Sequence, residues 1–328
     1  MDKLKYISIP TYFTESGREI TTNLSYQIFG RTLGDAPIVL VNHALTANSN
    51  VLGVSGWWNK IIGKEKCIST ETYTVLAFNV PGNGFDTKAE NIIEDYKNFT
   101  ARDVAQLFLL GLQQLRINKV FAIIGGSTGG GIAWEMVAIN QVVIEHLIPI
   151  ASDWKSTDWV LANCHIQDSI LNNSANPLFD ARIHAMTLYR TPESLTEKFK
   201  RTEKEKGLYN VESWLNYHGN ELTSRFQLSA YKLMNHLLKT VDITRGRGEF
   251  LEVATTISSS IHIITINSDL FFKPQENWKT YTYLKLLKDN VTISEINSIH
   301  GHDAFLIEYD QLSKILKPIF KTEKEVSK

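Results

Sequence analysis

A run of glycines around a single serine, within residues 119–140, constrains the fold of this chain more than any other feature. The stretch reads KVFAIIGGSTGGGIAWEMVAIN and begins with an apolar run, Val120–Ile124. That run is short and rich in branched residues, which suits a buried parallel strand. After the glycines, apolar residues from Ile132 onward recur along one face of a helix. The stretch therefore predicts a strand, a sharp turn at Ser127 and a helix.

Gly-x-Ser-x-Gly at such a turn is the nucleophile elbow of α/β-hydrolase-type enzymes. The serine of an elbow has a strained backbone, and the chain on either side passes so close that Cβ atoms would clash. The new helix also directs free N–H groups and the positive end of its dipole at the serine. Ser127 is therefore the candidate nucleophile.

Other apolar runs alternate with helical patterns at the spacing of a doubly wound parallel sheet. We expect helices at 101–116, where Thr100 is the N-cap and Asp103 its acidic partner, and at 275–289 and 303–317. The runs expected to form strands are 4–9, 23–29, 38–41, 73–80, 120–124, 144–150, 261–266 and 291–296. In such sheets, ligands bind at the carboxyl ends of the strands.

Strand-like runs are absent from about Ser152 to Ser260, where the chain is polar, helix-forming and scattered with aromatic residues. We interpret this segment, residues 153–258, as a helical lid. The lid would be inserted into an α/β-hydrolase core formed by residues 1–152 and 259–328. The fold class predicted is α/β, with a mostly parallel, doubly wound sheet.

A serine hydroxyl needs a base within hydrogen-bond reach, and the base needs a carboxylate to orient it. In this fold they follow the serine in the order Asp, His. Asp269 comes just past one predicted strand, and His300 and His302 come just past the next. Gly301 allows the sharp turn that would direct His302 at the serine, so His302 is preferred and His300 stays the alternative.

The oxyanion of an acyl-transfer intermediate needs N–H donors. One would be the backbone N–H of Thr128. The other should come from the loop after Val41, from Ala44 or Leu45, and we take Leu45 as the candidate. His43 in that loop is expected to be structural. Trp57 and Trp58 fit packing better than a substrate wall.

Composition excludes several classes of protein. The formal net charge is −1 and the chain is 43% hydrophobic and 21% charged, so no field favours nucleic acid or an anionic membrane. The two cysteines, Cys67 and Cys164, have no paired-ligand spacing, so no metal site is expected. No signal-peptide core or membrane-length apolar run is present, and a cytoplasmic protein is the expectation.

Several motifs together resemble the homoserine O-acetyltransferases of methionine biosynthesis. The resemblance spans nearly the whole chain and is specific in combination. The motifs are Asn42-His43-Ala44-Leu45-Thr46, Gly56-Trp57-Trp58, the elbow, Met186-Thr187-Leu188-Tyr189-Arg190-Thr191-Pro192, Trp214-Leu215-Asn216-Tyr217-His218-Gly219, Asn267-Ser268-Asp269-Leu270-Phe271-Phe272 and Gly301-His302-Asp303-Ala304-Phe305-Leu306.

The resemblance implies a ping-pong reaction in which the serine takes an acetyl group from acetyl-CoA and passes it to L-homoserine. It implies no permanently bound cofactor and a homodimer joined through the lids. It also selects His302 as the base. Arg190 would bind the substrate carboxylate and Asp303 its ammonium group, which agrees with the need of a zwitterion for one group of each sign.

The chain departs from the family pattern around the acyl pocket. Thr128 and Gly131-Ile132 replace Met and Met-Gln, and Val80–Phe85 replaces a Leu-Gly-Gly-Cys loop. The lid is also shorter between Asn163 and Arg190. The acyl donor, acetyl or succinyl, therefore stays open, and so does the acceptor. The alternative function is a serine esterase with the same three residues and water as acceptor.

Overall fold

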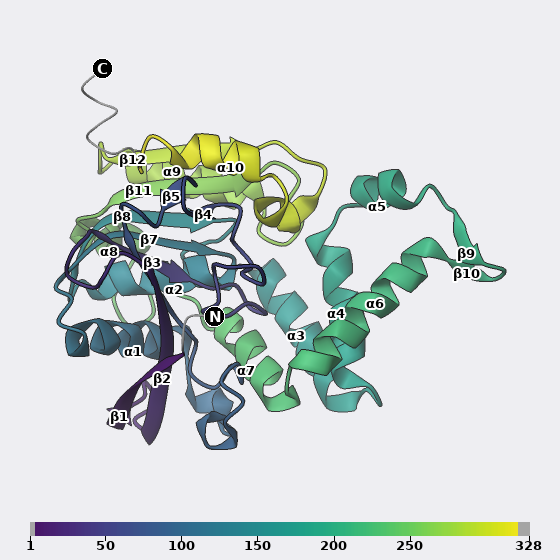
Figure 1. Cartoon of the computed structure of the whole chain (residues 1–328), viewed down its shortest axis with the longest axis horizontal. Coiled ribbons are helices and arrows are strands. Elements are labelled where there is room, and N and C mark those ends of the chain that lie inside the picture. Colours follow the sequence, from purple (N-terminus) through teal and green to yellow (C-terminus); the bar gives the residue numbers. More distant parts are fainter. Residues whose placement is uncertain (1–3, 321–328) are drawn as a thin grey trace.

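The computed structural model describes residues 4–320 and is built on an eight-stranded sheet (Figure 1). Its strands lie in the order β1-β2-β6-β3-β7-β8-β11-β12. The first two pair antiparallel with their neighbours, and the six from β6 to β12 run parallel. The strands are β1 (Lys5–Phe13), β2 (Glu19–Gly30), β3 (Ile38–Asn42), β6 (Thr74–Phe78), β7 (Lys119–Gly126), β8 (Val143–Ile150), β11 (Ser260–Ile266) and β12 (Val291–Ile296).

The centre of the sheet is covered on both faces. Every residue of β3 and β6 is buried, as expected of continuous apolar runs in a parallel sheet. One face carries α1 (Ala101–Gln114) and α2 (Thr128–Ile139). The other carries α10 (Tyr309–Leu316) and the loop between β3 and β6, which includes β4 (Ile62–Gly63) and β5 (Ile68–Ser69). The predicted doubly wound α/β fold is confirmed.

Helix α1 begins where its capping signal lies. The Thr100 side chain accepts a hydrogen bond from the Asp103 N–H, and the Asp103 carboxylate accepts one from the Thr100 N–H. This reciprocal pair satisfies two backbone donors at the start of the helix, as the sequence predicted.

Helices fill most of the chain between β8 and β11. In Figure 1, α4, α6, α5 and the small hairpin extend away from the sheet, and we call residues 177–225 the lid arm. Helix α8 packs instead against α2 and α9 (Pro274–Lys285). The division at residues 152 and 258 remains a prediction. The elements are α3 (Asp158–Asn173), α4 (Pro177–Tyr189), α5 (Pro192–Phe199), β9 (Glu203–Glu205), β10 (Leu208–Tyr209), α6 (Asn210–Arg225), α7 (Leu228–Lys239) and α8 (Phe250–Thr256).

Two expectations were wrong. The region without strand-like runs contains the β9–β10 hairpin, which turns at Gly207 with φ +83° and exposes all of β9, so it has no apolar alternation to detect. The last helix, predicted over 303–317, is divided into a 3₁₀ turn, Gly301–Leu306, and α10. The N–H groups of Ile307 and Glu308 both donate to the Ala304 carbonyl, and the turn ends there. The apolar pattern of the sequence continues across this break, so it did not reveal the division.

Within residues 4–320, no helix is long and apolar enough to cross a membrane.

Candidate active site

Ser127 lies at a strained turn between β7 and α2, with φ 56° and ψ −127°. A non-glycine residue in this conformation costs free energy and persists only when its surroundings hold it. The Ser127 N–H donates to the Ile150 carbonyl of β8 at 2.9 Å, and the Ser127 carbonyl accepts from the Gly130 N–H at 2.9 Å. The neighbouring strand and the first turn of α2 therefore hold the serine in place.

The glycines of the elbow allow other segments to approach. A Cβ on Gly129 would lie 2.3 Å from the Asn42 carbonyl oxygen at the end of β3, and one on Gly126 would lie 2.6 Å from the Phe305 ring. Both distances are too short for real atoms. The elbow thus contacts the loop after β3 on one side and the 3₁₀ turn on the other.

Asp269 and His302 form a buried pair. The two residues are 1% and 3% exposed, and the His302 Nδ1 lies 2.7 Å from the Asp269 Oδ2. The other oxygen, Oδ1, accepts from the backbone N–H groups of Phe271 and Phe272 at 2.7 and 2.9 Å. The carboxylate is therefore fixed from both sides. With its Nδ1 hydrogen on Asp269, the imidazole has its Nε2 free to accept a proton.

Aromatic rings surround His302 and fix its plane. Phe272 stacks on it with centroids 5.4 Å apart and an interplanar angle of 22°. Tyr189, Phe271 and Phe305 lie 5.5–5.7 Å away. The sequence does not indicate that these rings belong to the site, because they come from α4, the loop after β11 and the 3₁₀ turn, which meet only in the fold.

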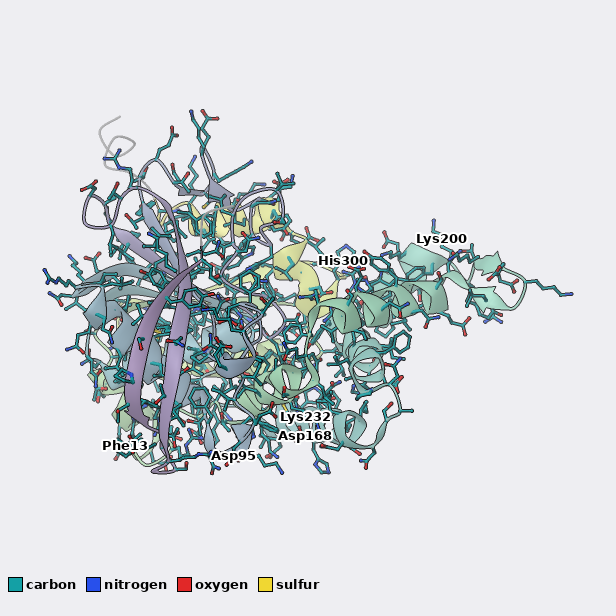
Figure 2. All side chains as sticks on the ribbon, turned by 60° about the horizontal axis from the view of Figure 1, so that its bottom comes forward. Phe13, Asp95, Asp168, Lys200, Lys232 and His300 are labelled. Carbon is teal, nitrogen blue, oxygen red and sulfur yellow. The ribbon has the colours of Figure 1, made fainter. Side chains whose placement is uncertain are left out.

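The other candidate base, His300, faces the lid. Its Nδ1 lies 2.9 Å from the Ser194 hydroxyl in the first turn of α5. Figure 2 shows His300 where the C-terminal segment meets the lid arm. Gly301, with φ +66°, turns the chain between the two histidines. The structure therefore places His302, and not His300, against Asp269.

Ser127 and His302 lie on elements that contact each other, because Phe305 packs against both Gly126 and the His302 ring. In the described part of the chain, no hydrogen bond joins the Ser127 hydroxyl to His302. Such bonds are often longer in a free enzyme than in its complex with substrate.

The two candidate oxyanion donors belong to adjacent segments. Leu45 is 7% exposed and follows β3, while Thr128 is fully buried at the start of α2. The Asn42 side chain donates to the Gly129 carbonyl at 3.4 Å and joins the segments. At the end of α6, the Arg225 Nη1 donates to the Thr46 carbonyl at 2.8 Å, which ties the lid arm to the same loop.

His43 has a structural role. Its Nδ1 donates to the Ala44 carbonyl at 2.8 Å, and its Nε2 accepts from the Val80 N–H at 3.0 Å. Burial lowers the pKa of His43 to about 4, so the ring is neutral at pH 7. The tryptophan pair also packs: Trp58 is fully buried and contacts Phe305 edge-on, and Trp57 donates to the Asn48 carbonyl.

Arg190 and Asp303 meet beside His302. An Arg190 guanidinium nitrogen, Nη1, lies 3.9 Å from the Asp303 Oδ2, and Arg190 is 8% exposed. Within residues 4–320, the buried Arg190 Nε has no hydrogen-bond partner. Burial raises the pKa of the Asp303 carboxyl, while the charges of His302, Arg182 and Arg190 oppose the rise. One cationic and one anionic side chain are thus held together next to the base.

A small cavity lies among the lid helices, next to residues that contact this site. Most of its lining residues are spaced along α3, α4 and α7 so that they face a common space. The sequence did not predict this cavity, because the three helices meet only in the fold. It is lined by Leu45, Asn163, Cys164, Gln167, Ala185, Leu188, Tyr189, Tyr231, Asn235, Leu238 and Phe271. Tyr189 and Phe271 belong both to the cavity and to the cage around His302. Within residues 4–320, no cluster of three or more His, Cys, Asp or Glu side chains could hold a metal ion.

Comparison with known proteins gives relatives that match most of the chain. A family model described as the alpha/beta hydrolase fold matches residues 37–281. The homoserine O-acetyltransferase of Methanococcus vannielii is 31% identical over 351 residues, covering 95% of this chain and 71% of that protein. The homoserine O-acetyltransferase of Salinibacter ruber is 28% identical, covering 94% of this chain and 95% of that protein.

Solved structures of two kinds of enzyme superpose equally well. A homoserine O-acetyltransferase from Bacillus anthracis has a TM-score of 0.88 at 19% identity and covers 98% of both chains. Esterase E22 has a TM-score of 0.87 at 17% identity, covering 98% of this chain and 100% of that one. At these identities the likeness shows the fold alone, so it does not distinguish transfer from hydrolysis.

Proposed function

Because the chain belongs to the homoserine O-acetyltransferase family and is an enzyme of that kind, we propose that it transfers an acetyl group from acetyl-CoA to the hydroxyl of L-homoserine. The reaction would be a ping-pong one, with Ser127 as nucleophile, His302 as base and Asp269 as the residue that orients the base. The product would serve methionine biosynthesis.

In the first half-reaction, Ser127 Oγ attacks the thioester carbonyl while His302 Nε2 takes the hydroxyl proton. Asp269, bonded to Nδ1 at 2.7 Å, stabilises the imidazolium. The tetrahedral oxyanion accepts hydrogen bonds from the backbone N–H groups of Leu45 and Thr128. The C–S bond then breaks, His302 protonates the CoA sulfur, and an acetyl ester remains on Ser127.

In the second half-reaction, the homoserine hydroxyl replaces CoA. Its proton passes to His302 as its oxygen attacks the acetyl ester, and the same proton returns to Ser127 Oγ when the ester bond breaks. Ser127 and His302 are 5% and 3% exposed, which would limit the access of water to the acyl-enzyme until the alcohol arrives.

The observation that carries the proposal is the Arg190–Asp303 pair beside the base. A zwitterionic amino acid needs a cation for its carboxylate and an anion for its ammonium group. Both are present here, because Asp303 directly follows His302 in the chain and lies 3.9 Å from the Arg190 Nη1. Arg190 has an N–H donor available, because its buried Nε has no hydrogen-bond partner among the described residues. Water as acceptor requires neither side chain.

The competing function is ester hydrolysis. It would use Ser127, His302 and Asp269 in the same way, and the fold is shared with solved esterases. Release of the CoA thiol from acetyl-CoA and from succinyl-CoA separates the two, when measured with L-homoserine, with L-serine and without an acceptor. We expect release from acetyl-CoA that depends on L-homoserine. Release at the same rate without an acceptor would support hydrolysis and overturn transfer.

The remaining features are proposed on the same basis. No permanently bound cofactor takes part, and the substrates are small molecules, without nucleic acid or membrane as partners. We place the enzyme in the cytoplasm, as a homodimer joined through its lids.

A further inference from the structure

An indole ring on the lid arm lies close to two cationic side chains. The Lys198 Nζ on α5 is 4.8 Å from the centre of the Trp214 ring on α6, and the Arg190 guanidinium carbon is 5.8 Å from it. His218 contacts the same ring edge-on, with centroids 4.5 Å apart. A half-buried aromatic surface therefore continues outward from Arg190 and the active site.

A third cation belongs to this surface. The Arg182 guanidinium on α4 lies 5.9 Å from the centre of the Tyr189 ring, which itself contacts His302. Burial, and then the charges of Arg182, Lys198 and Arg190, lower the pKa of His218 to about 4. All three cations thus act on one neutral histidine. We call Arg182, Arg190, Lys198 and Trp214 the lid cation cluster.

The cluster has more positive than negative charge. In the described structure, Asp303 is the sole carboxylate within ion-pair distance of any of its cations, and it contacts Arg190. Neither Arg182 nor Lys198 has an ion-pair partner within residues 4–320. Like charges held close together repel one another, most strongly where water is partly excluded. An anion bound among them would remove that repulsion.

The homoserine carboxylate supplies one negative charge, and Arg190 is sufficient for it. The other two cations, Arg182 and Lys198, and the Trp214 ring then remain without a ligand. They match a phosphorylated nucleoside, which needs cations for its phosphates and a flat aromatic surface for its base. This step rests on the proposed acyl-CoA chemistry, because that donor carries such a nucleotide at the end remote from its thioester.

We infer that the lid cation cluster binds the nucleotide end of the acyl donor, with Lys198 and Arg182 on the phosphates and Trp214 against the base. The donor would then extend from the lid arm, past Arg190 and Tyr189, to Ser127.

Lys198→Glu tests this inference, because Lys198 is exposed and its replacement leaves the core intact. The matched control is Lys206→Glu, a charge reversal in the β9–β10 turn at the far end of the lid arm (Figure 1). KM is measured with acetyl-CoA and with S-acetylpantetheine, a thioester donor without the nucleotide. We expect Lys198→Glu to raise the KM for acetyl-CoA about tenfold or more, as for loss of a charge-assisted hydrogen bond. The KM values for S-acetylpantetheine and L-homoserine should not change.

An equal rise for both donors would mean that Lys198 only supports the lid, and no rise for either would mean that it does not meet the donor. Each result overturns the inference. Calorimetric titration with adenosine 3′,5′-bisphosphate separates it from the proposed function. Binding that Lys198→Glu weakens and Lys206→Glu does not, in a protein that fails to transfer acetyl groups, would sustain the nucleotide site and refute the transferase. Absence of binding to the unmodified protein would refute the site alone.

Discussion

At the scale of single residues, Arg190 is the side chain that most separates an amino-acid acyltransferase from an esterase. It is buried, its Nη1 lies 3.9 Å from the Asp303 Oδ2, and its Nε has no hydrogen-bond partner in the part of the chain that the structure describes. We expect Arg190→Ala to raise the KM for L-homoserine at least tenfold through loss of a charged hydrogen bond. Hydrolysis of a small activated ester should stay near normal. Arg201→Ala, an exposed arginine of the same lid arm, is the control. Equal loss of both activities would show that Arg190 is structural.

The raised pKa of Asp303 predicts that the KM for the acceptor, L-homoserine, depends on pH. Burial raises the pKa of its carboxyl, so Asp303 loses its charge at a higher pH than an exposed aspartate as acid is added. Only the ionised form attracts the homoserine ammonium group. The KM for L-homoserine should therefore rise as the pH falls through this raised pKa, while the KM for acetyl-CoA stays flat. The same KM profile in Asp303→Asn would contradict the assignment.

At the scale of elements, helix α2 holds the elbow and is itself held by a buried ionic network. Glu135 on α2 is fully buried and accepts from Arg102 at 3.0 Å and from Arg247 at 3.1 Å. Arg102, on α1, also bonds Glu15 at 2.9 Å. The network joins the β1–β2 turn, both helices and the segment before α8.

Removal of Glu135 should destabilise the fold. Glu135→Ala leaves two arginines without their shared partner, and breaking a buried ion pair costs roughly 3–5 kcal/mol. Chemical denaturation would measure the free energy of unfolding. Glu145→Ala, which removes a partly exposed partner of Lys119, should cost less than about 1 kcal/mol. Equal losses in the two variants would mean that the Glu135 network adds nothing beyond a surface pair.

Local sequence patterns predicted much of the architecture, because buried parallel strands appear as short apolar runs and the loops after them as polar residues. The apolar runs located all eight strands of the main sheet, and the positions just past β11 and β12 pointed to Asp269 and His302. The contact of Arg190 with Asp303 could not be read from local pattern, since the two lie on separate elements far apart in sequence. The resemblance supplied both residues. The aromatic cage around His302 was missed for the same reason.

At the scale of the whole molecule, the lid arm projects from the sheet domain with α4 and α6 packed against each other (Figure 1). Tyr217 on α6 is 58% exposed, and we expect it to lie in the proposed contact between the lids. Sedimentation velocity should show a dimer that Tyr217→Arg weakens. Leu286→Arg, at an exposed position after α9, should leave it unchanged. A monomer at micromolar concentration would contradict the dimer.

The central claim is that Ser127 carries the acetyl group between donor and acceptor. Intact-mass measurement after mixing the enzyme with acetyl-CoA, without acceptor, tests it most directly. We predict a mass increase of one acetyl group, located on Ser127 by peptide mapping and absent from Ser127→Ala. Addition of L-homoserine should remove the group and yield O-acetylhomoserine. Homoserine-dependent product formation by Ser127→Ala at an undiminished rate would contradict the account.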